Sequence, residues 1–306
     1  MATINEYLDY LTNARGVSAQ TLRAYRNDLG KFDEWNHSHN VKTEDAATRD
    51  IRLFMEQLGT QGLSAISVNR CLSSIRGFFH YLIRFSVRAD DPSASIKNLK
   101  TPKTLPSFLW EREMAQFAEL PETSKRLWTE RDTALILTMY SAGLRISEVM
   151  SLRLDDCKAN FSGANVIGKG DKERPVFFSE EAQEAIIAYL PKRFERLKAT
   201  PSTDRLFVSM KGKPLSVSGI RWIIAQYSAL FDEQTGLGKN IHPHSLRHSF
   251  ATHLVKAGCD IRLVQEMLGH KSVSTTARYA HVDIKRLKEV YSRAHPHAGR
   301  SPDEPD

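Results

Sequence analysis

The sequence is poor in cysteine and has no long hydrophobic run. Its three cysteines, Cys71, Cys157 and Cys259, lie far apart and form no CxxC pair. This excludes a disulfide-rich secreted scaffold and favours a reducing compartment. The longest apolar stretch, around 134–139, is far shorter than a membrane span, and the N-terminal MATINEYLDY has no signal-peptide pattern. We therefore expect a cytoplasmic protein without a membrane partner.

The sequence also lacks the motifs of nucleotide and metal chemistry. It has no P-loop and no carboxylate cluster, and Asp155 and Asp156 precede a turn-like stretch, so we interpret them as turn residues. His244 and His248 have a spacing that zinc can use, but the HExxH glutamate is missing and Arg247 between them would repel a cation. The sequence therefore predicts neither a metal nor a cofactor.

What the sequence does have is an excess of positive charge. Its 43 lysines and arginines outnumber its 36 acidic residues, which gives a net charge of +7. The isoelectric point is about 9.2. A basic balance favours a polyanionic partner. With 306 residues the chain is long enough for two domains, each with its own core.

Residues 1–88 show helical patterns only, and we interpret them as a four-helix domain. Ser18 can cap the second helix, a third is expected over 46–58, and a fourth follows Ser64. The polar faces of these helices carry basic residues, which either bind phosphates or form a solvated surface: Arg23, Arg26, Lys31, Arg70 and Arg76. Residues 89–107 contain lysine and proline without an apolar period, which predicts an extended linker.

Residues 108–282 predict a second, α-rich domain. Its string ANVIGKGDKERPVFF is typical of a β-hairpin with the turn at 168–172. A new helix is expected to begin within Leu144–Glu148, after a stop at Gly143. Further helices or strand-like segments are expected over 110–119, 130–141, 180–196, 206–209 and 217–230.

Near the C-terminus, a helix that begins at Pro243 and stops at Gly258 places two polar side chains on one face. His244 and Arg247 are three residues apart and therefore neighbours on the helix surface. A separate apolar stripe would bury the helix: Leu246, Phe250 and Leu254.

Two more polar side chains follow at the edges of short helices. Asp260 can cap a helix over 261–268, which Gly269 ends, so that His270 comes just after a helix end. Tyr279 falls in a short third helix that Ser274 can cap. Polar residues gathered at element edges are more typical of a functional site than of a core.

These segments resemble the sequence boxes of the tyrosine recombinases, the integrase-type enzymes of DNA strand exchange. HPHSLRHSFATHLV resembles their HxxR box, and LGHKSVSTTARYAHV resembles their LGHxxxxTTxxYxH box. GLRISE is similar to the first arginine box, and GKGDKER to a hairpin that carries a lysine. The resemblance covers nearly the whole chain. It implies a mainly α fold, in which a four-helix core-binding domain precedes an α-rich catalytic domain with a small β-hairpin, as in DNA breaking-rejoining enzymes.

The resemblance implies six catalytic positions, all filled here: Arg145, Lys169, His244, Arg247, His270 and Tyr279. A phenol can attack a DNA phosphodiester directly and conserve the bond as a 3′-phosphotyrosyl link, the role implied for Tyr279. Arg145 and Arg247 would donate paired hydrogen bonds to the phosphate, which a lysine cannot copy. Glu148 could orient Arg145 or merely supply charge to a first helical turn.

Proton transfer falls to the three other positions. Lys169 would protonate the leaving 5′-hydroxyl, and its assignment rests on the family pattern because Lys172 and Arg174 are nearby basic alternatives. His244 would handle the phenol proton and His270 would hydrogen-bond the phosphate, although either could serve as the base.

The compact length is most like that of the Xer-type enzymes, which resolve chromosome dimers at cell division. The resemblance implies DNA with paired half-sites as substrate and a homo- or hetero-tetramer on two duplexes at the bacterial nucleoid. A second related recombinase and a cell-division DNA translocase are candidate partners. Residues 283–306 are expected to form an inter-protomer helix and a disordered tail.

Three alternatives remain at this point. A phage or transposon recombinase of similar size is the alternative within the family. A type IB topoisomerase shares the chemistry but relaxes supercoils without exchanging partners, and the oligomer-forming tail argues against it. A DNA-binding protein that no longer cleaves is the third, and the full set of catalytic residues argues against that.

Overall fold

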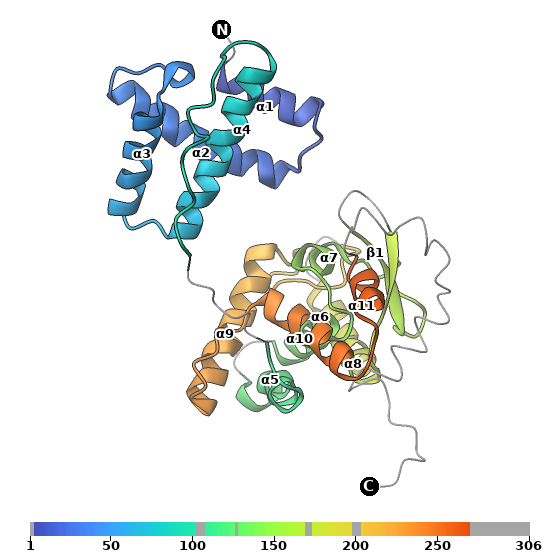
Figure 1. The fold of residues 1–306 in the computed structure, drawn as a ribbon. Helices are drawn as coiled ribbons and strands as arrows, with labels where there is room; N and C mark the ends of the chain where they lie inside the picture. The colour runs from blue at the N-terminus through green and yellow to red at the C-terminus, as the bar shows by residue number, and fades with distance from the viewer. Residues whose placement is uncertain (1–2, 102–107, 126–127, 169–172, 198–202, 270–306) are drawn as a thin grey trace. The chain divides into compact units, whose positions relative to one another are not determined.

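The chain folds into two compact units, Met1–Thr104 and Leu105–Asp306, which Figure 1 shows in a computed structural model. The structure describes residues 3–101, 108–125, 128–168, 173–197 and 203–269. The segments expected to carry Lys169, His270 and Tyr279, and the C-terminal helix, lie outside these residues. None of the described helices is long and apolar enough to cross a membrane.

The first unit consists of four helices, as its apolar periods predict. The helices are α1 (Ile4–Asn13), α2 (Ala19–Ser38), α3 (Thr48–Thr60) and α4 (Ala65–Arg84), with a short 3-10 helix at Thr43–Asp45. Serine hydroxyls cap the N-termini of two of these helices: Ser18 accepts from Thr21 N–H, and Ser64 accepts from Ser67 N–H. An aromatic core lies between α2, α3 and α4: Phe32, Phe54 and Phe79 are buried.

A buried carboxylate joins α2 to α4. Asp28 is 2% exposed and accepts hydrogen bonds from Arg70 Nη2 at 2.8 Å and Ser74 Oγ at 3.0 Å. Burial raises the pKa of Asp28, and the bonds from Ser74 and Arg70 oppose this rise. Arg70, one of the basic residues expected on the polar face, is thus held by an internal carboxylate. Arg76 likewise donates to the Asn98 side chain, at 2.9 Å.

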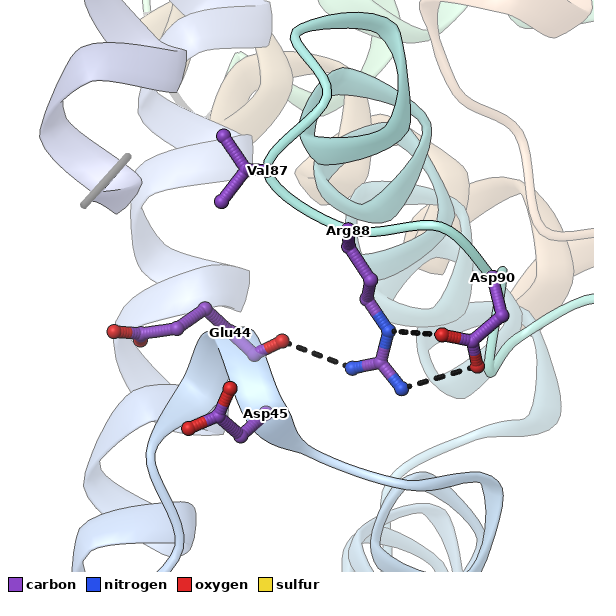
Figure 2. Close-up of a pocket in the computed structure, with 5 residues that line it drawn as sticks. All are labelled: Glu44, Asp45, Val87, Arg88 and Asp90. Atoms are coloured by element: carbon purple, nitrogen blue, oxygen red, sulfur yellow. Dashed lines mark hydrogen bonds and ion pairs between the residues drawn. The ribbon is translucent and has the colours of Figure 1, made fainter.

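The segment after α4 packs against the first unit. Figure 2 shows a pocket in which Arg88 donates to the Glu44 carbonyl at 2.9 Å and to both oxygens of Asp90. Farther on, Ile96 is buried in the core of this unit. Leu99 exchanges two hydrogen bonds with the Asn69 side chain. The polar groups that line the pocket are thus hydrogen-bonded to one another. The contacts of Ile96 and Leu99 attach part of the lysine-rich segment to the four helices.

The second unit is built around one fully enclosed helix, α6 (Thr129–Ser141). Residues 131–141 are all buried, and α6 packs against three other helices, α5, α8 and α10. A helix enclosed on all sides needs internal partners for its polar groups. Asp132 obtains them from Arg131 and from Tyr227 Oη at 3.0 Å. The other helices are α5 (Glu111–Ser124), α7 (Ile146–Ser151), α8 (Glu180–Leu197), α9 (Val217–Thr235), α10 (Pro243–Lys256) and α11 (Ile261–Met267).

The predicted hairpin is present and forms the described sheet of this unit. Strands β1 (Gly163–Ile167) and β2 (Glu173–Phe177) are antiparallel, with Ile167 opposite Glu173. Asp155 and Asp156 lie in a turn, as predicted, and Asp156 accepts a hydrogen bond from Arg153 N–H at 2.9 Å.

Three predictions of local structure were wrong in detail. The helix expected over 110–119 is α5, which continues to Ser124. The helix expected to end at residue 230 continues to Thr235, because Phe231 packs against Phe117 in the core and Gly236 at φ 63° provides the helix end. The apolar run 206–209 belongs to neither β1 nor β2, and Val208 makes only an isolated β-bridge to Pro214. Burial in the core, rather than pairing in a sheet, explains its apolar composition.

Candidate active site

Arg145 is positioned by the start of α7. The chain leaves α6 through Gly143, whose φ of +55° favours glycine, and Arg145 is the N-cap residue of the next helix. Its backbone N–H donates to Glu148 Oε2 at 2.8 Å, and its Nη1 donates to Oε1 at 2.8 Å. The hypothesis that Glu148 orients Arg145 is therefore confirmed: one carboxylate fixes both the backbone and the guanidinium of this residue.

Arg247 reaches the same carboxylate from α10. It is 8% exposed, donates to the carbonyl oxygens of Gly143 and Leu268, and places Nη1 3.9 Å from Glu148 Oε2. Burial, together with the neighbouring cation of Arg145, lowers the pKa of Arg247 to about 10, against the opposing effect of Glu148. The side chain stays protonated at neutral pH.

A third guanidinium belongs to the hairpin. Arg174, on β2, donates from Nη2 to Glu148 Oε2 at 2.9 Å and from Nη1 to the Met267 carbonyl at 2.6 Å. Burial lowers its pKa, and Glu148 opposes this effect. The sequence suggested Arg174 only as a substitute for Lys169; its contact with Glu148 depends on tertiary packing and left no local signal.

The C-terminal end of α11 supplies further acceptors. Three successive carbonyl oxygens each accept from a different arginine: Met267 from Arg174, Leu268 from Arg247 and Gly269 from Arg145. These carbonyls belong to the negative end of a helix, which favours cations. Gly269 has a φ of +64°, and a Cβ there would lie 3.2 Å from both Cδ and Nε of Arg174. The positive φ favours glycine at this position, and any larger residue would also crowd the Arg174 side chain.

The charge of the cluster suits a phosphodiester. Three guanidinium groups face one carboxylate, so the described cluster has an excess of two positive charges, partly offset by the α11 carbonyls. The side chain of Arg145 is 27% exposed, against 13% for Arg174 and 9% for Arg247. A phosphate approaching from solvent would therefore meet Arg145 first, with Arg247 behind it.

His244 lies in the first turn of α10 and is exposed, three residues before Arg247 on the same helix. The preceding His242 was not singled out from the sequence. It is the N-cap residue of α10, and its Nδ1 accepts from Ser245 N–H at 3.2 Å. Burial and the nearby His244 lower the pKa of His242, which favours the neutral ring that this cap needs. Within the described ranges, no group of three histidine, cysteine or acidic side chains could hold a metal ion.

The structure thus brings together Arg145 and Arg247, places His244 on the helix of Arg247, and adds Arg174 and Glu148. Lys169, His270 and Tyr279 lie outside the described residues, and their roles stay predictions.

Comparison with known proteins identifies the family. Residues 107–286 match the phage integrase family, and residues 4–85 match the phage integrase N-terminal SAM-like domain. The chain is 39% identical to the tyrosine recombinase XerC of Treponema denticola over 302 residues, covering 95% of this chain and 98% of that protein. It is 37% identical to the tyrosine recombinase XerD of Chlorobaculum tepidum over 298 residues, 96% of each chain.

Solved structures agree on the fold. The Tn1549 transposon integrase in complex with circular intermediate DNA has a TM-score of 0.70 at 19% identity, covering 94% of this chain and 99% of that one. The XerH site-specific recombinase in a post-cleavage complex with palindromic difH substrate has a TM-score of 0.65 at 24% identity, covering 95% and 85%. With the family matches and the near full-length relatives, these findings show that the chain belongs to the phage integrase family, as a site-specific tyrosine recombinase of the Xer type.

Proposed function

We propose that this recombinase resolves chromosome dimers at cell division, by exchanging strands between two copies of one DNA site. Its full-length similarity to both XerC and XerD proteins supports this role over that of a phage or transposon integrase. A second, related recombinase and a cell-division DNA translocase would be its partners at the nucleoid.

The observation that carries the proposed chemistry is the convergence of Arg145 and Arg247 on Glu148. One arginine is the N-cap residue of α7 and the other lies within α10, yet both are anchored to the same carboxylate and to the successive carbonyls of Leu268 and Gly269, directly after α11. Guanidinium groups held this way before DNA arrives need little reorganisation as charge develops on the phosphorus. Arg145 and Arg247 would each donate to the non-bridging oxygens of the scissile phosphate.

The remaining catalytic roles complete one balanced step. Tyr279 Oη would attack the phosphorus and form the 3′-phosphotyrosyl bond, while the bond to the 5′-oxygen breaks. His244 would take the phenol proton, Lys169 would give a proton to the leaving 5′-oxygen, and His270 would hydrogen-bond the phosphate. Reversal of the step with a partner strand rejoins the DNA, so no external energy source is required.

The domain roles follow from the same proposal. Residues 1–88 would bind one side of the DNA core site, residues 89–107 would link them to the catalytic domain at 108–282, and residues 283–306 would contribute an inter-protomer helix and a tail. Four protomers would assemble on two duplexes, each on a half-site.

Two measurements test the proposal. Mapping of bound DNA across the genome should give one chromosomal site made of paired half-sites, whereas sites at the ends of a mobile element would contradict the dimer-resolution role. A suicide substrate, nicked so that the short released fragment with the free 5′-hydroxyl diffuses away, should trap the protein covalently on that site. Failure of the wild-type protein to form this adduct on its mapped site would overturn the chemistry.

A further inference from the structure

Arg174 holds the Glu148 carboxylate from strand β2, an element that carries neither Arg145 nor Arg247. Both of its terminal nitrogens are engaged, Nη2 with Glu148 Oε2 at 2.9 Å and Nη1 with the Met267 carbonyl at 2.6 Å. Its side chain is 13% exposed, about half the value of Arg145. These two bonds attach β2 both to the acid of the site and to the last residue of α11.

The partners of Arg174 are themselves parts of the site. Glu148 Oε2 also accepts from the Arg145 backbone N–H, and Oε1 accepts from Arg145 Nη1. Arg174 therefore closes a chain of contacts that runs from β2 through Glu148 to Arg145. Its second contact attaches β2 to the end of α11, where the carbonyls of Leu268 and Gly269 hold Arg247 and Arg145.

We propose that Arg174 is a positioning residue, which locks the Glu148 carboxylate and the end of α11 so that Arg145 and Arg247 are held ready for the scissile phosphate. This inference rests on the proposed roles of those two arginines. It requires a planar fork at position 174, because a single lysine Nζ cannot donate in the directions of both the Glu148 carboxylate and the Met267 carbonyl as a guanidinium does.

The experiment is a double-mutant cycle on cleavage of bound DNA. The rate of covalent adduct formation is measured in a single turnover on a suicide half-site for wild type, Arg174→Lys, Glu148→Gln and the double variant. Because the protein is already bound to DNA when cleavage starts, unfolded molecules do not enter the rate. Arg174→Lys should lower the rate about 10- to 100-fold, as expected for loss of a hydrogen bond to a charged group, with half-site affinity within about threefold of wild type.

The two changes should not be additive, because both act through the same carboxylate. The cleavage rate of the double variant should be within about twofold of the rate of the slower single variant. Arg193→Lys is the matched control, since Arg193 is another buried arginine of this unit that donates to backbone carbonyls, those of Thr203, Arg205 and Leu206. Arg193→Lys should lower thermal stability. Any effect that it has on the cleavage rate should simply add to the effect of Glu148→Gln.

A substrate with a 5′-thiol leaving group separates this role from acid catalysis, because sulfur leaves without a proton. The Arg174→Lys defect should persist on that substrate. Rescue by the thiol would assign Arg174 to the leaving group, and an Arg174→Lys rate equal to wild type, or additive losses with Glu148→Gln, would also overturn the positioning role. These outcomes leave wild-type cleavage intact, so they are distinct from failure of the proposed function.

Discussion

At the scale of single residues, the site depends on one buried acid. Glu148 is 2% exposed and faces Arg145, Arg174 and Arg247. Alone, a buried carboxylate and a buried cation such as Arg247 would each be costly, but together with the partly buried Arg145 and Arg174 they satisfy one another. The arrangement keeps charged groups inside a folded protein while leaving a net positive charge for an anionic substrate.

Tyr279→Phe should abolish the covalent protein–DNA adduct while leaving affinity for a half-site nearly unchanged. The substitution removes the nucleophilic oxygen, whereas affinity comes mainly from phosphate contacts spread over the chain. Denaturing gel electrophoresis on a suicide substrate measures the adduct, and a gel-shift titration measures binding. An adduct that still forms in the variant would show that another residue is the nucleophile.

Lys169→Ala should block cleavage of a normal phosphodiester but be rescued by a substrate with a 5′-thiol leaving group. The thiol has a low pKa and needs no general acid. Lys172→Ala is the matched control from the same predicted turn and should cleave the normal substrate at close to the wild-type rate. If the thiol rescues Lys172→Ala instead, the leaving-group proton comes from Lys172.

At the scale of elements, the turn between α6 and α7 joins the core to the site. Gly143 has a φ of +55°, and a Cβ there would lie 2.5 Å from the Phe250 ring and 2.8 Å from Leu268. Its carbonyl oxygen also accepts from Arg247. The same residue therefore allows the turn, the close packing of α10 and α11 against it, and one anchor of Arg247.

Gly143→Ala should destabilise the second unit by about 3 kcal/mol, the sum of a left-handed backbone penalty and forced repacking against Phe250. Gly236→Ala is the matched control, because its φ is +63° but no atom lies within 4 Å of the added Cβ. It should cost only about 1 kcal/mol. Denaturant unfolding of the full chain checks both values, and equal losses in the two variants would show that packing at Gly143 is not tight.

The pairing of α2 with α4 should respond to acid through Asp28. The folded state raises the pKa of this carboxyl above its unfolded value, so the fold binds the proton more tightly than the unfolded chain does. Its contribution to stability is therefore fully present below the unfolded pKa, about 3.9 for an aspartate, and is lost as pH rises through the raised folded pKa. Thermal unfolding of wild type and Asp28→Asn between pH 4 and pH 7 tests this. The advantage of wild type over the variant should shrink as pH rises, and an advantage that grows would contradict it.

At the scale of the whole molecule, the two units are both α-rich but differ in what they hold. The first encloses a carboxylate that serves packing, Asp28, and the second encloses one that organises candidate catalytic groups, Glu148. The C-terminal segment lies outside the described residues, so its role is predicted from sequence alone. There, Ile284, Leu287 and Val290 follow a helical period, and the helix that they predict is too short to be stable without docking.

Truncation after Val282 should preserve binding of one protomer to a half-site, while cooperative binding and strand exchange are lost. The segment removed contains the helix expected to dock on a neighbouring protomer in a closed ring. Truncation after Ala298 removes only the polar end GRSPDEPD and should change neither property. Gel-shift titrations on full sites and a recombination assay on two sites provide the readout. Normal recombination after the first truncation would show that this helix does not link protomers.

Much of the secondary structure could be predicted because its signals are local. Ser18 and Ser64 cap α2 and α4, Pro243 begins α10, and Gly269 follows α11, each within a residue or two of its predicted place. The prediction failed over residues 206–209, where the same apolar composition fits a strand or a buried loop.

The sequence by itself determined the family and six candidate catalytic positions, because motif spacing is a property of the chain as written. Only the tertiary structure decided what holds them. Arg174 and Met267 are 93 positions apart, and Arg145 and Gly269 are 124 apart, yet each pair is joined by a hydrogen bond. A hydrogen bond depends on distances of about 3 Å that the packing of distant elements creates, so no local pattern could assign Arg174 to Glu148.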